Sequence, residues 1–296
     1  MKVHRRIPQL LILAALAALA GCNSKKPTVD TATPAAALAL TPWGAHVERF
    51  EGEYFEENPS FAVSQGRHEF DGKLPDWSAN GIKKEIAWLA DSRERTLAFD
   101  DAKLSAQERF EKQYLLAVID GDLFWLKDAG RPFLNPAHYV YPLDPSVYIT
   151  RPYAPAEQRI KAFIAYLKAV PAAAAQIRAN LRTPMPRTLI DYGVGAFGGY
   201  AEFYQGDAIA AFATVKDQDL QAQLKQASTA AARSMQALAD WLKSEQKRAN
   251  ENYAIGAEKF SRMLAQTERV DTPLDKLKAI GEADLERNTL ALQKAR

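Results

Sequence analysis

The sequence predicts an all-α protein, an irregular array of helices with one long loop rich in proline and tyrosine. Three observations support this fold class. Apolar residues recur at helical spacing through most of the chain beyond residue 41, and capping residues precede several of these stretches. No segment shows a convincing strand alternation, and no internal repeat indicates a regular solenoid.

Residues 1–21 have the pattern of a lipoprotein signal peptide. Three basic residues, Lys2, Arg5 and Arg6, precede an apolar run over residues 10–20, which is too short for the roughly 20 residues that span a bilayer. The run ends in Leu-Ala-Gly before Cys22, the single cysteine of the chain. We expect cleavage before Cys22 and acylation of its thiol and amine, which would anchor the protein to the lipid bilayer. The alternatives are an ordinary secretory signal with a chance cysteine and a membrane-spanning helix.

The residues after Cys22 predict a location and a tether. Asn23 stands where an aspartate commonly retains lipoproteins at the inner membrane, so we expect the outer membrane of the cell envelope, facing the periplasm. Residues 22–41 are rich in Lys, Thr, Pro and Ala and predict a lipidated flexible tether. Residues 42–296 then form the predicted helical domain, with no further long apolar run.

The charge balance gives no indication of a nucleic-acid partner. The formal net charge of the 296 residues is +2, and loss of the three basic signal residues leaves +2 − 3 = −1. A mature chain so close to neutral carries no excess of basic residues for a phosphate backbone.

The first helices are predicted by their spacing and caps. A helix that includes Trp43 ends near Pro59, because a proline disfavours helical geometry in the residue before it. Ser78 is suited to cap a second helix, whose periodic positions continue to Leu97. A capping box of Ser105 and Glu108 starts a long helix over residues 106–128.

Residues 130–155 interrupt the helical pattern. Six prolines forbid a continuous helix there, and aromatic residues lie among them. Long ordered loops are often functional. The alternative, which we favour on the residues alone, is a belt that covers the ends of helices.

Helical periodicity resumes after the loop. The predicted helices cover residues 156–170, 171–181, 189–205, 219–242, 256–266 and 273 to the end of the sequence. The helix over residues 189–205 contains four glycines, Gly193, Gly195, Gly198 and Gly199, each costing about 1 kcal/mol relative to alanine. Either close packing against another helix or close approach of a ligand would explain these glycines.

The residues show no recognisable catalytic or metal-binding motif. His68-Glu69 resembles the start of a zinc motif, but Gly72 stands where the second histidine is required. His46, His68 and His138 could meet in space, although scattered histidines are usually surface residues. No Gly-x-Ser-x-Gly elbow occurs, and the adjacent carboxylates, such as Asp100-Asp101, are typical of solvated helix faces. We therefore assign no catalytic residue, no metal ligand and no cofactor to this chain.

Four segments in order resemble a known family. They are Asn58-Pro59 through Leu74-Pro75-Asp76-Trp77-Ser78, the block that begins Tyr153-Ala154-Pro155-Ala156-Glu157-Gln158-Arg159, the segment Ala254-Ile255-Gly256-Ala257-Glu258-Lys259-Phe260, and the stretch Leu277 to Leu285. Together they resemble the bacterial domain of unknown function 885, whose members are often lipoproteins related in fold to helical zinc metallopeptidases. The resemblance covers about residue 48 to the end of the sequence.

The resemblance implies that this chain is the N-terminal half of a longer protein. Members are typically about twice as long, with a zinc-binding motif in the C-terminal half, so no zinc ligand is carried over to any residue here. In helical metallopeptidases the N-terminal half commonly forms one wall of a cleft. By that analogy Tyr139, Tyr141, Tyr148 and Tyr153 would line a cleft for a peptide substrate.

Competing functional hypotheses follow. In one, the chain is the helical portion of a membrane-anchored, metal-dependent peptidase or hydrolase, and its last helix exposes an apolar face where the second half packs. In the other, it is a non-catalytic periplasmic lipoprotein that binds a ligand or protein partner. A degenerate product without activity is a third reading. The last helix keeps its apolar period up to Arg296, which fits either a terminal helix or a shortened chain.

Overall fold

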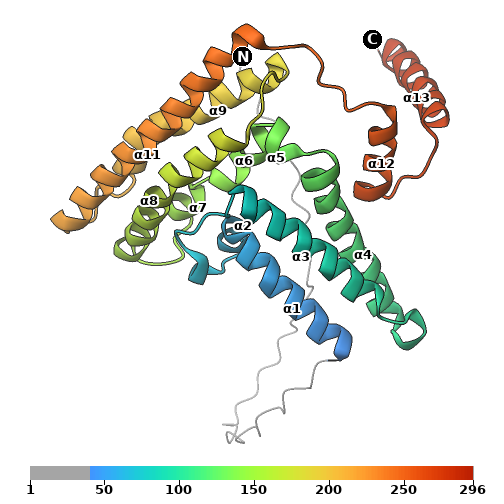
Figure 1. Cartoon of the computed structure of the whole chain (residues 1–296), viewed down its shortest axis with the longest axis horizontal. Helices are drawn as coiled ribbons and strands as arrows, with labels where there is room; N and C mark the ends of the chain where they lie inside the picture. The colour runs from blue at the N-terminus through green and yellow to red at the C-terminus, as the bar shows by residue number, and fades with distance from the viewer. Residues whose placement is uncertain (1–40, 296) are drawn as a thin grey trace, which may run out of the picture. The chain divides into compact units, whose positions relative to one another are not determined.

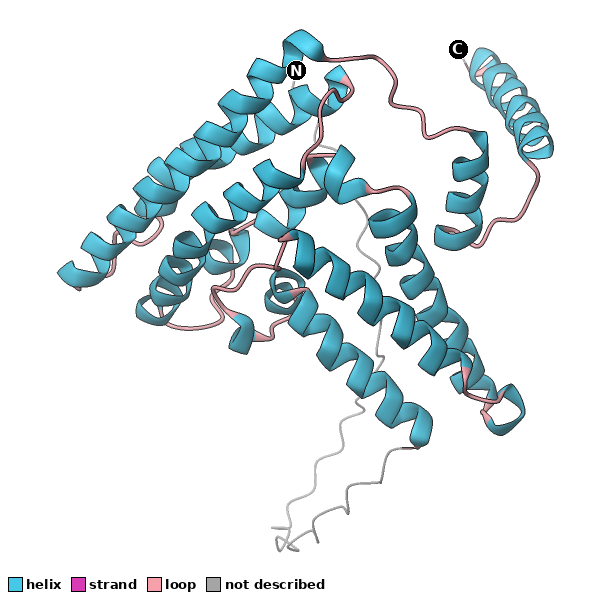
Figure 2. Ribbon diagram, viewed as in Figure 1, coloured by secondary structure: helices cyan, strands magenta, loops and turns pink. Residues whose placement is uncertain are grey.

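The computed structural model describes residues 41–295, and these form helices and connecting turns without a strand (Figures 1 and 2). The one β-type interaction among them is an isolated bridge between Pro186 and Asn250. The predicted all-α class is therefore confirmed. The buried residues form two clusters, one for each of two groups of helices.

The first group contains α1 (Pro42–Glu57), α3 (Ala79–Leu97) and α4 (Ala106–Leu123). Side chains of Thr41, Ser78 and Ser105 accept hydrogen bonds from the first-turn amides of these helices, and the Ser105–Glu108 capping box is formed as predicted. The short helices α2 (Pro59–Ser64), η1 (His68–Phe70) and η2 (Asp101–Lys103) lie in the connections. The buried cluster consists of Trp43, Phe50, Leu89, Leu104, Leu115, Ile119 and Leu126.

The second and larger group is built around α8 (Ala156–Asn180), α9 (Arg187–Gln205) and α11 (Gln218–Glu245), with the short α10 (Asp207–Ala210) between α9 and α11. Helix α11 packs along both α8 and α9 (Figure 1). This group fully buries several large aromatic side chains, including Phe163, Tyr166, Phe197 and Tyr204.

Helix α8 corrects the prediction of two helices separated at Pro171, because one helix continues through that proline. Proline inside a helix removes one hydrogen bond and costs about 3 kcal/mol. The cost is offset by burial beyond Pro171, where Ala173, Ala174 and Ile177 complete the apolar face. By length and composition α8 is the one described helix that could cross a membrane, yet 50% of that stretch is buried inside the protein, as in a core helix.

The segment between α4 and α8 is not structureless. It contains the π-helical turn η3 (Phe124–Asp128), then α5 (Arg131–Leu134), α6 (Ala137–Val140), η4 (Tyr141–Leu143) and α7 (Ser146–Thr150). Its short turns form backbone hydrogen bonds of their own, and tyrosine hydroxyls bond to further backbone groups. Three hydroxyls donate to carbonyls of this segment: Tyr139 to Pro132 at 2.6 Å, Tyr166 to Leu143 at 2.7 Å and Tyr200 to Val140 at 2.8 Å.

The last part of the described chain contains η5 (Gln246–Arg248), α12 (Ala257–Thr267) and α13 (Leu274–Lys294). Helix α12 packs on α4 and η3. No residue of α13 is buried, and Ile280, Leu285, Leu290 and Leu292 are each at least 50% exposed. Large apolar side chains of α13 are therefore open to solvent in the described part of the chain.

The glycines of α9 have different surroundings. A Cβ on Gly193 would lie 2.7 Å from Leu242 and 2.9 Å from Pro136, so close packing explains this glycine. A Cβ on Gly195 would meet nothing within 4 Å.

This contrast gives a matched pair of variants. Gly195→Ala should raise the free energy of unfolding by about 0.5–1 kcal/mol, because alanine lowers the entropy cost of the helix. Gly193→Ala should be less stable than Gly195→Ala by about 1–3 kcal/mol, because Pro136 has to move. Urea unfolding of both variants measures the difference, and equal stabilities would contradict the packing role of Gly193.

Candidate functional site

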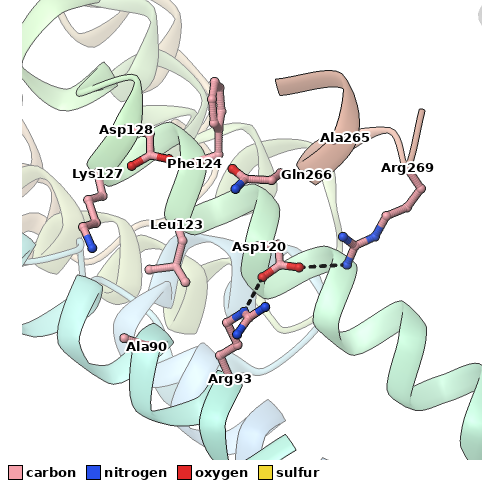
Figure 3. Close-up of a pocket in the computed structure, with 10 residues that line it drawn as sticks. All are labelled: Ala90, Arg93, Asp120, Leu123, Phe124, Lys127, Asp128, Ala265, Gln266 and Arg269. Atoms are coloured by element: carbon pink, nitrogen blue, oxygen red, sulfur yellow. Dashed lines mark hydrogen bonds and ion pairs between the residues drawn. The ribbon is translucent and has the colours of Figure 1, made fainter. Parts of the chain in front are cut away.

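A pocket lies where α3, the junction of α4 with η3, and the end of α12 meet (Figure 3). Its volume is about 440 Å³, and its wall combines charged side chains with an apolar floor. The lining residues are Ala90, Arg93, Asp120, Leu123, Phe124, Lys127, Asp128, Ala265, Gln266 and Arg269.

Asp120 joins three parts of the chain at this pocket. One carboxylate oxygen accepts a 2.7 Å hydrogen bond from Arg93 Nε, and the other accepts a 3.0 Å bond from Arg269 Nη2. Figure 3 shows the carboxylate between the two guanidinium groups. The hydrogen bond that Arg93 donates to Asp120 is the largest cause of a raised pKa of Arg93. The Asp120 side chain is 15% exposed, so the bridge is partly shielded from solvent.

The backbone around the pocket is irregular on two sides. Residues Phe124–Asp128 form a π-helical turn, a feature often found at functional sites. Arg269, just after α12, has a φ of 55°, which is uncommon for a residue with a side chain. Such backbone costs about 1–3 kcal/mol and persists where surrounding contacts hold it, here the pairing with Asp120.

One buried polar atom of the pocket has no partner. Gln266 Oε1 is buried and accepts no hydrogen bond from any described residue. Asp128 pairs with Arg262 at 3.7 Å, and Lys127 is exposed at the edge of the pocket. The arrangement can hold a small charged ligand that also donates a hydrogen bond, because pockets bind through an apolar floor and a few placed polar groups.

The predicted tyrosines are divided between the core and the surface. Tyr139 and Tyr148 are buried, with 0% and 3% exposure, so in the described structure they are core residues and do not line a cleft. Tyr141 is 68% exposed, and Tyr153 is half-buried. Cys22, the signal peptide of residues 1–21 and the tether up to residue 40 lie outside the described residues.

The histidines lie on separate elements. His46, on α1, shares a 2.9 Å hydrogen bond with Thr96, and burial lowers its pKa. His138, on α6, is largely buried, which lowers its pKa to about 4. Within residues 41–295 no group of three His, Cys, Asp or Glu side chains is placed to hold a metal ion. The residues present therefore do not form a zinc site.

His68 takes part in a small polar cluster. Its ring stacks on Tyr153, with centroids 3.5 Å apart, and its Nδ1 lies 3.1 Å from Asp71 Oδ1. The Tyr153 hydroxyl donates a 2.9 Å hydrogen bond to the other oxygen of Asp71. This cluster ties η1 to the turn before α8, and it gives His68 and Tyr153 a structural role.

Sequence reasoning did not single out the residues of the pocket. Arg93 occupies a position of the periodic stripe of α3, between Leu89 and Leu97, where an apolar residue is expected. The charge of Arg93 within this apolar stripe is the one signal in the sequence that points to the pocket. Asp120, Gln266 and Arg269 come from distant segments, so their meeting cannot be predicted from spacing.

The comparisons with known proteins identify the family. The family described as "Bacterial protein of unknown function (DUF885)" matches residues 59–296. This chain belongs to the DUF885 family. No curated protein matches it.

The solved structures that are similar to this DUF885 chain include one that covers most of it. It is that of a putative lipoprotein of unknown function from Shewanella oneidensis, with a TM-score of 0.73 and 17% sequence identity. The match covers 84% of this chain and 46% of that chain, so the present chain spans about half the length of that protein. At this identity the similarity shows a shared fold.

The DUF885 chain also has a cluster of half-buried carboxylates, Glu57, Glu85 and Asp122, from α1, α3 and α4. Burial raises the pKa of Glu85 to about 7, and the charges of Asp122 and Glu57 add to the rise. Burial likewise raises the pKa of Asp122 to about 6, against the lowering effect of a hydrogen bond from Tyr54. Raised carboxyl pKa values occur at functional sites, and they also make stability depend on pH.

Glu85→Gln tests this cluster. The pKa of Glu85 rises from 4.5 in the unfolded chain to about 7 in the folded one. The stability that goes with protonated Glu85 is therefore fully present below pH 4.5, and the free energy of unfolding falls as the pH rises through 7. Glutamine cannot ionise, so the stability of the variant relative to wild type should increase from pH 5 to pH 8 by up to about 3 kcal/mol.

Urea unfolding at both pH values measures this difference. His138 changes stability in the opposite direction as the pH falls toward 4, but equally in both proteins, so the comparison isolates Glu85. Glu48→Gln, at an exposed position of α1 away from the cluster, is the matched control and should differ from wild type by the same amount at both pH values. A constant difference between Glu85→Gln and wild type would contradict the raised pKa.

Proposed function

We propose that this DUF885 chain is the helical, ligand-holding portion of a lipid-anchored hydrolase of the cell envelope, at the periplasmic face of the outer membrane. Its substrates would be peptides or related amides. The observation that carries the proposal is the α3–α4–α12 pocket, which combines charged side chains, an unpartnered buried acceptor and irregular backbone. The pocket has no nucleophile, so the chain would position the substrate.

Two observations support an anchored protein of greater length. The predicted lipoprotein signal of residues 1–21 ends before Cys22, and the structurally similar protein is itself described as a putative lipoprotein. That protein is about twice as long as the matched region, and α13 exposes an apolar face suited to packing against a further portion. Zinc, which the family resemblance implies, would then be bound by residues outside those described here, and no step of its chemistry is assigned to this chain.

The second candidate is a non-catalytic lipoprotein that binds a ligand or protein partner. The absence of a metal-binding group within residues 41–295 favours it. The same pocket would then serve binding alone. The two candidates differ in whether the native protein cleaves a peptide bond.

Cys22→Ser tests the anchor. The wild-type protein should be found in the outer-membrane fraction and leave it with detergent but not with high salt, because acyl chains bind by burial of methylene groups. Cys22→Ser should not incorporate labelled palmitate and should be missing from the outer-membrane fraction, whereas Ser24→Ala, two residues away, should be labelled and located as wild type. Labelling and immunoblots of the fractions measure this, and palmitate incorporation by Cys22→Ser would contradict lipidation at Cys22.

Intact mass and hydrolysis test the hydrolase proposal. The native lipoprotein extracted from its own membranes should have about twice the mass of this chain and should cleave peptides in a metal-dependent way. The present chain should not cleave peptides with added zinc, because none of its described residues forms a zinc site. A native mass equal to residues 22–296 plus acyl chains, without cleavage, would leave the binding lipoprotein as the function.

A further inference from the structure

We infer that the α3–α4–α12 pocket recognises the C-terminal end of a peptide, that is, a terminal carboxylate together with the amide N–H of the same residue. This inference rests on the proposed function and names the part of the substrate that this pocket would hold. Four properties of the pocket carry it: its net charge, the free donors of its arginines, its unpartnered acceptor and its apolar floor.

The lining has one more positive charge than negative charges. Arg93, Lys127 and Arg269 are cationic, whereas Asp120 and Asp128 are anionic. A ligand with a single negative charge complements this lining. A free amino acid, with both an ammonium and a carboxylate group, has no net charge and matches the lining less well.

The arginines have donors left after pairing with Asp120. Each guanidinium has five N–H donors, and Asp120 accepts from one nitrogen of Arg93 and one of Arg269. The two arginine side chains are 38% and 44% exposed, so a ligand from solvent can reach them. The planar donor fork of arginine matches the two oxygens of a carboxylate.

Gln266 supplies the second recognition element. Its buried Oε1 has no partner among the described residues, and an unmet buried acceptor is costly. Solvent does not reach this oxygen, so it accepts an N–H of the ligand only when the Gln266 side chain turns into the pocket. The amide N–H next to a terminal carboxylate is such a donor, and simple carboxylates lack it.

The floor of the pocket limits the ligand to a small apolar side chain. Ala90, Leu123, Phe124 and Ala265 form the apolar part of the lining. With a volume of about 440 Å³, the pocket has room for the last residue or two of a peptide.

The experiment uses the full chain in detergent and three small probes, with affinity measured by isothermal titration calorimetry. N-acetyl-L-alanine has both features, N-acetyl-L-alanine amide lacks the charge, and propionate lacks the N–H. N-acetyl-L-alanine should bind at least about 10-fold more tightly than either other probe, since each lost feature leaves a pocket group unpartnered. Equal binding of the acid and its amide would overturn the inference.

Variants assign the binding to this pocket. Gln266→Leu should reduce the affinity for N-acetyl-L-alanine to that for propionate, and Arg269→Gly should reduce it about 10-fold or more. Glycine suits the φ of 55° at position 269, so this variant removes the guanidinium without straining the backbone. Arg287→Gln, at an exposed position of α13, is the control and should bind as wild type. Unchanged affinity in both pocket variants would overturn the inference.

A peptide pair separates this inference from the proposed function. N-acetyl-trialanine, which has a single negative charge, should bind more tightly than its C-terminal amide. If both peptides bind equally well, the chain still holds peptides and the proposed function stands, but terminal recognition is wrong. If neither peptide binds, both are wrong.

Discussion

The rest of the structure depends on buried tyrosine hydroxyls that satisfy the backbone between residues 130 and 155. A segment broken by prolines cannot pair its own carbonyls and amides in a long helix, and unpaired groups in a core are costly. Tyr139 and Tyr166 donate to its carbonyls, and Tyr148 accepts a 2.9 Å hydrogen bond from the amide of Gly72. Burial among apolar side chains strengthens these bonds by excluding water.

Hydrogen bonds from Asn180 join the two groups of helices. Asn180, at the end of α8, donates to the carbonyl of Trp77 at 2.7 Å and to the hydroxyl of Tyr139 at 3.1 Å. The start of α3, the turn at α6 and the end of α8 therefore meet at one buried point. This is a further reason for α8 to continue through Pro171, because a helix that ended there would not bring Asn180 to Trp77.

The pocket lies beyond this fixed core, where α12 rests on α4 and η3. Its polar groups come from three elements, so its geometry depends on how firmly α12 is held. The bridge from Arg93 through Asp120 to Arg269 supplies a directional contact there. Lys127 and Asp128 belong to the π-helical turn that continues α4, and both line the pocket.

The sequence by itself determined the fold class, most helix positions and the family, because helical spacing and caps are local signals. The caps at Ser78 and Ser105 and the ends of α9 and α12 lie within a few residues of their predicted places. The tertiary structure alone decided that Tyr139 belongs to the core and that Asp120 meets Arg269, 149 residues away. Burial and long-range pairing depend on which segments pack together, and the helical periodicity of one sequence does not show which segments are in contact.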